Sequence, residues 1–151
     1  MTESLRTRLA RLKFNLFPAY RFGGGRVTYV RHDWQEIHVE VPLSWRTRNY
    51  VGTIFGGSLY AAVDPIYMMM LIQTLGEEFT VWDTEAEIDF QKPGESTLSA
   101  EMMIPDSELE PLRELDPGES TNRTYEVDLV DEDGTVHATV EKTLYVRRDD
   151  Q

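Results

Sequence analysis

Residues 55–75 read FGGSLYAAVDPIYMMMLIQTL, and Gly76 follows them as a C-terminal stop. Apolar side chains fall on every side of a helix wound from this stretch, and such a helix has to be enclosed by protein. The strongly apolar part, Leu59–Ile72, is too short for a bilayer span of about 20 residues and contains Asp64 and Pro65. We therefore expect one long buried helix with a sheet curled around it.

Segments of strand character flank this helix on both sides. Arg26–Leu43 alternates apolar and polar side chains in two runs separated by His32 and Asp33, which predicts two adjacent strands. Four further strands are predicted after the helix: Phe79–Lys92, Ser96–Ile104, Thr121–Asp131 and Thr135–Arg148. In the first of these, positions 86, 88 and 90 are apolar while 85, 87 and 89 are acidic, which is typical of a sheet with one face in water.

The order of elements favours the α+β class. Turns are expected at Pro93-Gly94 and at residues 131–134, and Ser107–Leu115 is expected to form a short helix or a loop excursion. Runs of strands around a single helix indicate a mostly antiparallel sheet. Because no repeat or linker is visible, we expect one domain over residues 1–151: a curved sheet wrapped around one long central helix, with an N-terminal helix in front.

The N-terminal segment predicts an amphipathic helix over residues 4–17. Its leucines are spaced four, three and four residues apart: Leu5, Leu9, Leu12 and Leu16. Gly23–Gly25 follow as a hinge, so residues 1–23 are interpreted as helix and linker. Residues 1–48 hold nine basic and four acidic side chains, whereas residues 49–151 hold six and 23. The basic end could face a membrane or a phosphorylated ligand, but we favour a solvated helix face and so do not expect membrane association.

Composition excludes several classes of function. The formal net charge of -12 repels nucleic acid. With no cysteine there is no disulfide, cysteine nucleophile or thiolate metal site. The three histidines, His32, His38 and His137, show no ligand spacing, so we expect neither a metal nor a cofactor. The N-terminal leucines are interrupted by arginines and lysine, which argues against a signal peptide and for a cytoplasmic protein.

The expected sheet also has a bearing on assembly. Six long strands leave at least one edge open, and pairing that edge with a second copy is a common remedy. We expect a homodimer, or a tetramer built from it.

The residues best placed for chemistry precede and begin the buried helix. Gly56 and Gly57 let the backbone approach a ligand closely, and the free N–H groups of a first helical turn receive an oxygen that carries negative charge. Such an oxyanion site serves acyl transfer when a base or nucleophile lies nearby. Asp64 is the only acid between Asn49 and Glu77. A carboxylate among apolar residues is costly unless it is paired, solvated in a cleft or in use.

Asp64 and Pro65 also permit a simpler interpretation. Aspartate as N-cap with proline at the first helical position is a favoured helix start, so the helix could begin at Asp64 and the glycine pair could form only a turn. We favour a helix that runs through and is kinked at Pro65, because residues 55–63 lack the polar residues of a separate loop.

The segment from Asn49 to Asp64 resembles the start of the central helix in hotdog-fold thioesterases of the phenylacetate-pathway type. Gly56-Gly57-Ser58-Leu59-Tyr60, Asp64-Pro65 and Val81-Trp82-Asp83 are similar to an uncharacterised, DUF4442-like branch of that superfamily. Members carry an Asn, then His-Gly-Gly, then an Asp or Glu. The order of elements fits from about residue 24 onward, while the motif itself spans 16 positions.

The resemblance implies hydrolysis of an acyl thioester of coenzyme A or of an acyl carrier protein. By similarity, the Gly56 or Gly57 amide polarises the thioester carbonyl, and Asp64 from the second subunit attacks it or activates water. Asn49 then positions the water or the aspartate. A residue on the following strand assists in some members, and Asp83 or Thr84 lies near that place.

One position departs from the family pattern. Where members have histidine before the glycine pair, this chain has Phe55, which cannot donate a hydrogen bond. The backbone donors remain, so we expect a thioesterase. The alternative is a non-catalytic module that binds acyl-CoA or regulates, having kept the pocket and lost the reaction.

Other residues near the motif are candidates for contact with substrate. These are Phe55, Ser58, Tyr50, Trp82 and Arg48, and for each of them packing or solvated charge is the simpler explanation. Met68, Met69 and Met70 could line an acyl channel, although plain core is the more common role of such methionines.

Overall fold

The computed structural model describes residues 2–150, which form five helices and six strands within that range. The elements follow in this order: α1 (Leu5–Leu16), α2 (Pro18–Gly23), β1 (Arg26–Val30), β2 (Glu36–Val41), α3 (Gly56–Val63), α4 (Ile66–Leu75), β3 (Phe79–Phe90), β4 (Leu98–Met103), α5 (Asp106–Arg113), β5 (Ser120–Val130) and β6 (Val136–Arg148). All six strands were predicted within a few residues of these bounds. For the segment expected to be either a short helix or a loop excursion, the structure shows a helix over residues 106–113.

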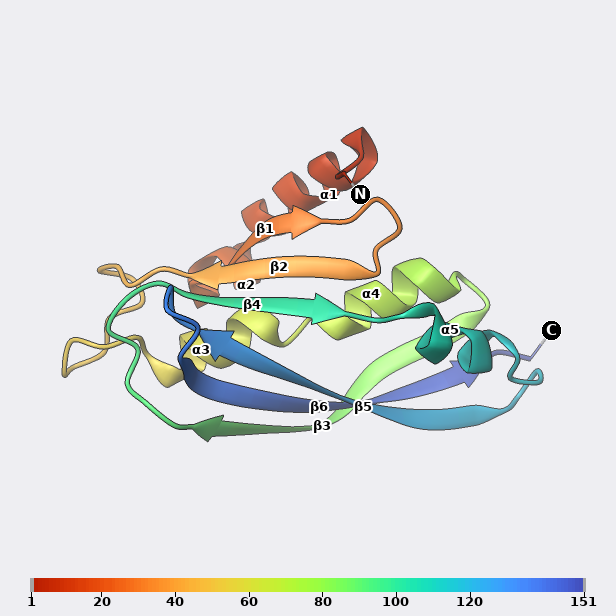
Figure 1. The fold of residues 1–151 in the computed structure, drawn as a ribbon. Helices are drawn as coiled ribbons and strands as arrows, with labels where there is room; N and C mark the ends of the chain where they lie inside the picture. Colours follow the sequence, from red (N-terminus) through yellow and green to blue (C-terminus); the bar gives the residue numbers. More distant parts are fainter. Residues whose placement is uncertain (1, 151) are drawn as a thin grey trace.

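The strands form one antiparallel sheet in the order β1-β2-β4-β5-β6-β3. The sheet bends sharply between its two halves, because β4 and β5 share a single paired position, Ser99 with Val130. Figure 1 shows β1, β2 and β4 above α3 and α4, and β5, β6 and β3 below these two helices. This confirms the α+β class with a curved sheet around a helical segment.

The helical segment inside the sheet is not one long helix, which corrects the expectation drawn from residues 55–75. It is divided into α3 and α4 by Asp64 and Pro65. Proline lacks an N–H and crowds the preceding turn, so the helix breaks there. The Tyr20 hydroxyl of α2 donates to the Ala62 carbonyl beside the break, 2.7 Å away. The chain does not start a helix at Asp64, and Gly56 and Gly57 are the first residues of α3.

The concave face of the sheet holds the core. Fully or nearly fully buried side chains of the two helices, among them Leu59, Val63, Ile66 and Met70, pack against inward residues of the strands. Burial alternates along β6, as is typical of a strand with one face in the core: the buried residues are Val140, Lys142, Leu144 and Val146, and the residues between them are not buried. No helix between residues 2 and 150 is long and apolar enough to cross a bilayer.

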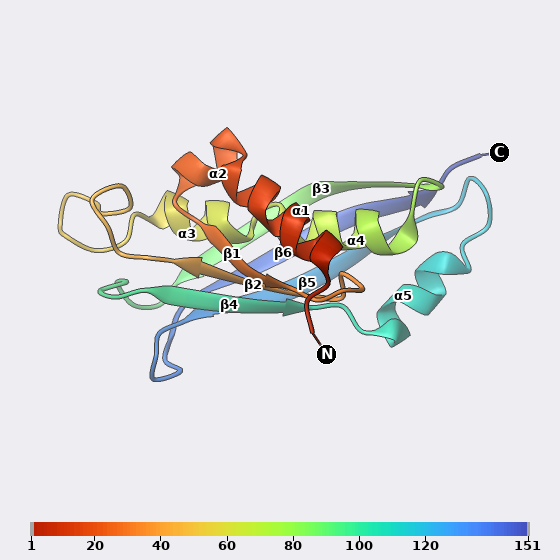
Figure 2. The same cartoon turned by 90° about the horizontal axis from the view of Figure 1, so that it is seen from above.

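The N-terminal helix forms as predicted, over residues 5–16, and is started by a capping box between Ser4 and Thr7. A second short helix, α2, occupies part of the segment interpreted as linker, with Pro18 at its first position. Figure 1 and Figure 2 both show α1 beside β1. The two ends of the sheet are therefore different: β1 lies beside α1, whereas β3 is a 12-residue edge strand.

Candidate functional site

The glycine pair begins α3 with its backbone donors free. Phe55 is the N-cap residue and supplies no side-chain cap. The Phe55 amide is anchored by donating to the Thr47 carbonyl, 2.7 Å away. Within residues 2–150 the N–H groups of Gly56 and Gly57 have no hydrogen-bond acceptor. This end of α3 therefore offers two adjacent donors at the positive end of the helix dipole.

A depression of about 420 Å³ lies at this end of α3. Its walls come from the loop before the helix, from the helix itself and from the segment after β3: Asn49, Thr53, Ile54, Gly56, Leu59, Phe90, Gln91, Lys92, Pro93 and Gly94. The Ile54 amide donates to the Gly94 carbonyl at 2.8 Å, which ties the first and last of these segments together. The depression thus joins two of the predicted residues, Asn49 and Gly56.

Two aromatic rings lie close to the glycines. A Cβ atom added at Gly57 would meet Phe55 Cε1 at 2.5 Å, and one added at Gly56 would meet the Phe90 ring at 3.0 Å. Both rings are more than half exposed. A side chain larger than glycine at either position would therefore push the Phe55 or Phe90 ring aside.

Asn49 directs its side chain into its own loop. Its Oδ1 accepts from the amides of Val51 and Thr53, at 3.1 and 3.0 Å, and its Nδ2 donates to Thr53 Oγ1 at 2.8 Å. These are the bonds of a residue that holds a turn. Asn49 shapes the loop leading to α3, and its amide is not directed at Asp64.

Asp64 lies at the other end of α3, in a cluster with Tyr60 and Lys142. Lys142 Nζ is 2.6 Å from Asp64 Oδ1, and the Tyr60 hydroxyl donates to the same oxygen at 2.7 Å. Lys142 Nζ also donates to Tyr60 Oη at 3.1 Å. The Asp64 side chain is 44% exposed, whereas that of Lys142 is 0% exposed. Asp64 is thus a partly exposed carboxylate that is paired with a buried lysine.

Asp83 supplies a second carboxylate to Lys142, with Oδ1 3.1 Å from Nζ. Its place in the cluster depends on a bulge in β3, where Thr84 has no partner between Asp83, opposite Leu144, and Glu85, opposite Thr143. Strict alternation would put Asp83 on the wet face with Glu85. The bulge turns it onto the face of Leu144 and so toward α3.

The electrostatics of the cluster follow from burial and pairing. Burial raises the pKa of Asp83, and Lys142 partly opposes that shift. Burial works to lower the pKa of Lys142, but its bonds to Asp64 and Tyr60 and the contact with Asp83 raise the pKa overall. Burial, reinforced by Asp64, raises the pKa of Tyr60. Lys142 therefore stays charged between two carboxylates.

The glycine amides and Asp64 do not meet within one chain. Asp64 comes eight residues after Gly56, which is roughly 12 Å along the axis at about 1.5 Å per residue. One copy therefore carries the two parts of the expected machinery at opposite ends of α3.

The other predicted residues lie in varied places. Ser58 is buried beside Gly24, and Tyr50 and Arg48 are exposed on the loop before α3. Trp82 stacks on Tyr145 with ring centroids 4.9 Å apart, on the face of the sheet opposite Asp83. Thr84 Oγ1 donates to the Thr143 carbonyl at 3.2 Å. The structure does not bring these side chains to Asp64.

The methionines of α4 divide between two roles. Met70 is fully buried, Met68 packs against the core, and Met69 lines a groove beneath α1. The described residues contain no cluster of histidines and carboxylates suited to a metal ion.

Lys142 is the site residue that the sequence analysis missed. A signal was present, since a lysine occupies an inward position of a strand between Val140 and Leu144. A buried lysine requires a counter-ion, and Asp64 was the one carboxylate already placed inside the sheet.

A family model described as "Domain of unknown function (DUF4442)" matches residues 9–146. The chain belongs to the DUF4442 family. The resemblance based on residues 49–64 is thereby confirmed. None of the curated protein sequences matches this DUF4442 chain.

Solved structures with the same fold carry thioesterase names. One from Pseudomonas aeruginosa, described as a protein of unknown function and probable thioesterase, has a TM-score of 0.79 at 18% identity, over 97% of this chain and 99% of its own. A structure described as a putative thioesterase from Shewanella oneidensis has a TM-score of 0.70 at 22% identity, over 93% of this chain and 96% of its own. A thioesterase from Haemophilus influenzae has a TM-score of 0.69 at 19% identity, over 98% of this chain and 93% of its own. At these identities the likeness of this DUF4442 chain to them establishes a shared fold.

Proposed function

We propose that the protein hydrolyses an acyl thioester of coenzyme A or of an acyl carrier protein, at a site shared by two copies of the chain. The observation that carries this proposal is the pair of free amides at Gly56 and Gly57, of which Gly56 lines a depression, together with a paired carboxylate at Asp64. Because the two parts are about 12 Å apart in one chain, a complete site needs the amides of one copy and the aspartate of its partner.

In the proposed reaction, the Gly57 N–H, aided by that of Gly56, donates to the thioester carbonyl oxygen. These donors stabilise the negative charge that develops there when the carbon is attacked. Asp64 either attacks the carbon itself or removes a proton from the attacking water. The carbon–sulfur bond then breaks, and the thiolate leaves and takes up a proton. Water completes the reaction in the covalent route by releasing the acid from Asp64.

Lys142 and Tyr60 hold Asp64 for either role. Both bond to Oδ1, so neither occupies Oδ2. A carboxylate fixed through one oxygen keeps the second for water or for the acyl carbon. A dimer through the open edge of β3 is the assembly we propose, since β3 carries Asp83 and ends at Phe90, beside the depression.

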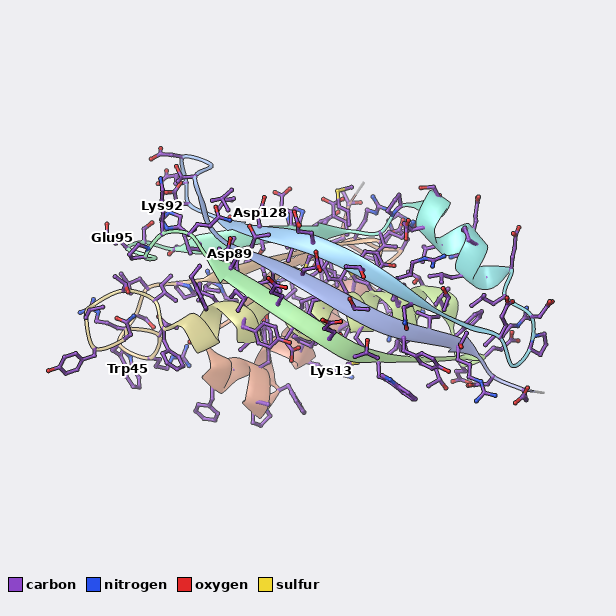
Figure 3. The ribbon with its side chains drawn as sticks, turned by 90° about the horizontal axis from the view of Figure 1, so that it is seen from below. Lys13, Trp45, Asp89, Lys92, Glu95 and Asp128 are labelled. Atoms are coloured by element: carbon purple, nitrogen blue, oxygen red, sulfur yellow. The ribbon has the colours of Figure 1, made fainter. Side chains whose placement is uncertain are left out.

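The first test measures thiol release from a panel of short, long and aromatic acyl-CoA substrates. We expect Asp64→Asn to lower turnover at least a hundredfold, in a chain that stays folded at the assay temperature although it melts lower for want of the ion pair with Lys142. The matched control is Asp89→Asn, which removes a carboxylate on the outer face of β3 (Figure 3). Full activity in Asp64→Asn would refute the assignment.

A second test asks whether the site is shared between copies. Asp64→Asn and Gly57→Ala protomers are mixed after mild unfolding and refolding. If Asp64 and Gly57 of different copies cooperate, each mixed dimer regains one intact site, and about a quarter of the wild-type activity returns at equal mixing. If both groups act within one copy, every site keeps a defect and no activity returns.

The second candidate function is an acyl-CoA-binding module without turnover. Phe55, which stands where the family carries histidine, favours it, because its ring gives no hydrogen bond to a carbonyl. Binding of a non-hydrolysable thioether analogue by a chain that releases no thiol would support this alternative. If histidine is the missing helper, Phe55→His should restore turnover, whereas Phe55→Leu should not.

A further inference from the structure

The helix α1 is attached to the protein through Phe14, whose ring packs against that of Tyr20 with centroids 4.6 Å apart, and through its polar side. Asn15 Nδ2 donates to the Val27 carbonyl and Asn15 Oδ1 accepts from the Val27 amide, both at 2.8 Å. Glu3 Oε1 accepts from the Val30 amide at 3.2 Å. Thr7, on the same side of the helix, is fully buried. Polar side chains of α1 and of the residues before it therefore pair with backbone groups on the free edge of β1.

As a consequence, the leucines point outward. Leu5, Leu9, Leu12 and Leu16 are 75%, 53%, 56% and 54% exposed, and their spacing of four, three and four puts them on one face. Phe17, 61% exposed, follows directly. A helix on the surface of a globular protein usually turns such a stripe toward the core. We call these five side chains the leucine stripe.

An apolar groove runs beside the leucine stripe. It has a volume of about 870 Å³ and is shared by α1, β1 and α4, with walls that include Leu9, Val27, Val30, Ile66 and Met69. Leucine stripe and groove together make a continuous apolar surface. A continuous apolar patch of this kind marks a site of interaction.

The charge around the leucine stripe differs from that of the remaining surface. Residues 2–26 contain six basic side chains and one acidic side chain, Glu3, which is already paired with Arg11 and Arg8. Arg6 and Lys13 line the groove and are exposed. Residues 27–151 carry nine basic and 26 acidic side chains. The outer face of the sheet carries Asp89 and Asp128 (Figure 3). An anionic partner is therefore attracted to α1 and repelled by the outer face of the sheet.

We propose that α1 docks the protein on an anionic lipid surface, with the leucine stripe inserted among the acyl chains and Arg6 and Lys13 near the phosphates. A basic helix with an exposed leucine and phenylalanine face is the composition of interfacial helices. A second copy is the less suitable occupant, because a two-fold contact would bring the two basic helices together. From the sequence alone, a solvated helix face was the favoured interpretation and membrane association the less favoured alternative. The outward leucine stripe is the reason for this different conclusion.

The test is cosedimentation of the full chain with vesicles. We expect binding to vesicles of equal parts phosphatidylglycerol and phosphatidylcholine at low salt, and much weaker binding to pure phosphatidylcholine or in about 0.5 M salt. Leu9→Ser with Leu12→Ser should weaken binding roughly tenfold or more. Arg6→Gln with Lys13→Gln should weaken it about fivefold for each charge removed.

The matched control is Trp45→Ser with Met103→Ser, which removes two apolar side chains that are 87% and 56% exposed elsewhere. Trp45 projects from the loop before α3 (Figure 3). This control should bind vesicles like the wild type. The charge variant alters only exposed groups, so the test stands even if the leucine variant fails to fold. The proposal is overturned if the wild type ignores anionic vesicles, if neither α1 variant weakens binding, or if light scattering shows that the leucine variant forms a smaller oligomer than the wild type.

Discussion

Lys142 Nζ lies 2.6 Å from Asp64 Oδ1, although no part of the lysine side chain reaches solvent. The lysine comes from the last strand and the aspartate from the break between the two central helices, so the ion pair joins the sheet to the helical segment. The same Nζ lies 3.1 Å from Asp83 Oδ1, on β3. One buried cation thus connects three elements at the residue we assign to chemistry.

Removal of that cation should both destabilise the protein and impair its site. Lys142→Met leaves Asp64 and Asp83 facing each other without a counter-ion. Because Asp64 is 44% exposed, we expect a loss of about 1–3 kcal/mol in the free energy of unfolding, less than for a fully buried pair. Denaturant unfolding of the single variants and of Lys142→Met with Asp64→Asn should show clear non-additivity. Additive losses would mean that the two side chains do not interact.

A substitution in the glycine pair should lower turnover without lowering stability. Gly57→Ala adds a helix former to α3 and should stabilise it by about 0.5–1 kcal/mol. The new methyl group would lie 2.5 Å from Phe55 Cε1 and would push the Phe55 ring aside. We expect the displaced ring to cover the proposed oxyanion donors. We expect turnover to fall while the melting temperature holds or rises. Gly57→Ala with Phe55→Ala should recover activity, and a failure to recover would assign the loss to the backbone instead.

Much of the fold was predictable because local patterns decide it. The period of two along residues 79–90 and 136–148 identified β3 and β6, and the apolar stretch with Gly76 located the helical segment. The break at Pro65 was harder, since a kinked helix and two helices have the same sequence pattern. What separates them is the packing around Ala62, whose carbonyl accepts from Tyr20, 42 residues earlier.

The candidate site was predictable only in part, for a similar reason. The glycine amides and Asp64 follow from one short stretch, but the partner of Asp64 lies 78 residues away on β6. Asp83 is turned inward by a bulge at Thr84, and Trp82 in consequence faces the other side. Register and bulges depend on how strands pair, and neither is encoded in the spacing along one strand.

His137 should make stability depend on pH. Its Nδ1 is 2.8 Å from the Pro93 carbonyl and its Nε2 is 2.8 Å from Asp131 Oδ2. Both partners are acceptors, so both ring nitrogens donate and the ring is charged. The bond to Asp131 raises the pKa of His137 above its ordinary 6.5, and the bond to His137 holds the pKa of Asp131 below its ordinary 3.8.

The sign of the effect follows from these directions. The raised pKa of His137 contributes stability that is complete below pH 6.5 and is lost as pH rises through the folded value. The lowered pKa of Asp131 contributes above pH 3.8 and is lost as pH falls through its folded value. We expect the melting temperature to fall by about 2–4 °C between pH 6 and 9. His137→Asn should remove most of this slope, and an equal slope in the variant would exclude His137 as its source.

The outer face of the sheet places like charges side by side. Glu141 on β6 is paired in register with Glu87 on β3 and with Glu126 on β5, and all three are exposed. Like charges opposite one another destabilise a sheet. Glu141→Gln should therefore raise the melting temperature by about 1–3 °C at low salt, and the gain should vanish near 1 M salt. Glu95→Gln, in the loop marked in Figure 3, should give no such gain.

Asn15 should be the residue that holds α1 on the edge of the sheet. Asn15→Ala removes both hydrogen bonds to Val27 and leaves an amide and a carbonyl of β1 without partners. We expect a loss of about 1–3 kcal/mol in the free energy of unfolding, since unpaired backbone groups keep their desolvation cost. Hydrogen exchange should quicken first in α1 and β1. Asn122→Ala, on β5, is the control, because that side chain makes none of the hydrogen bonds described within residues 2–150. Equal exchange in both variants would mean that the Asn15 hydrogen bonds do not hold the helix in place.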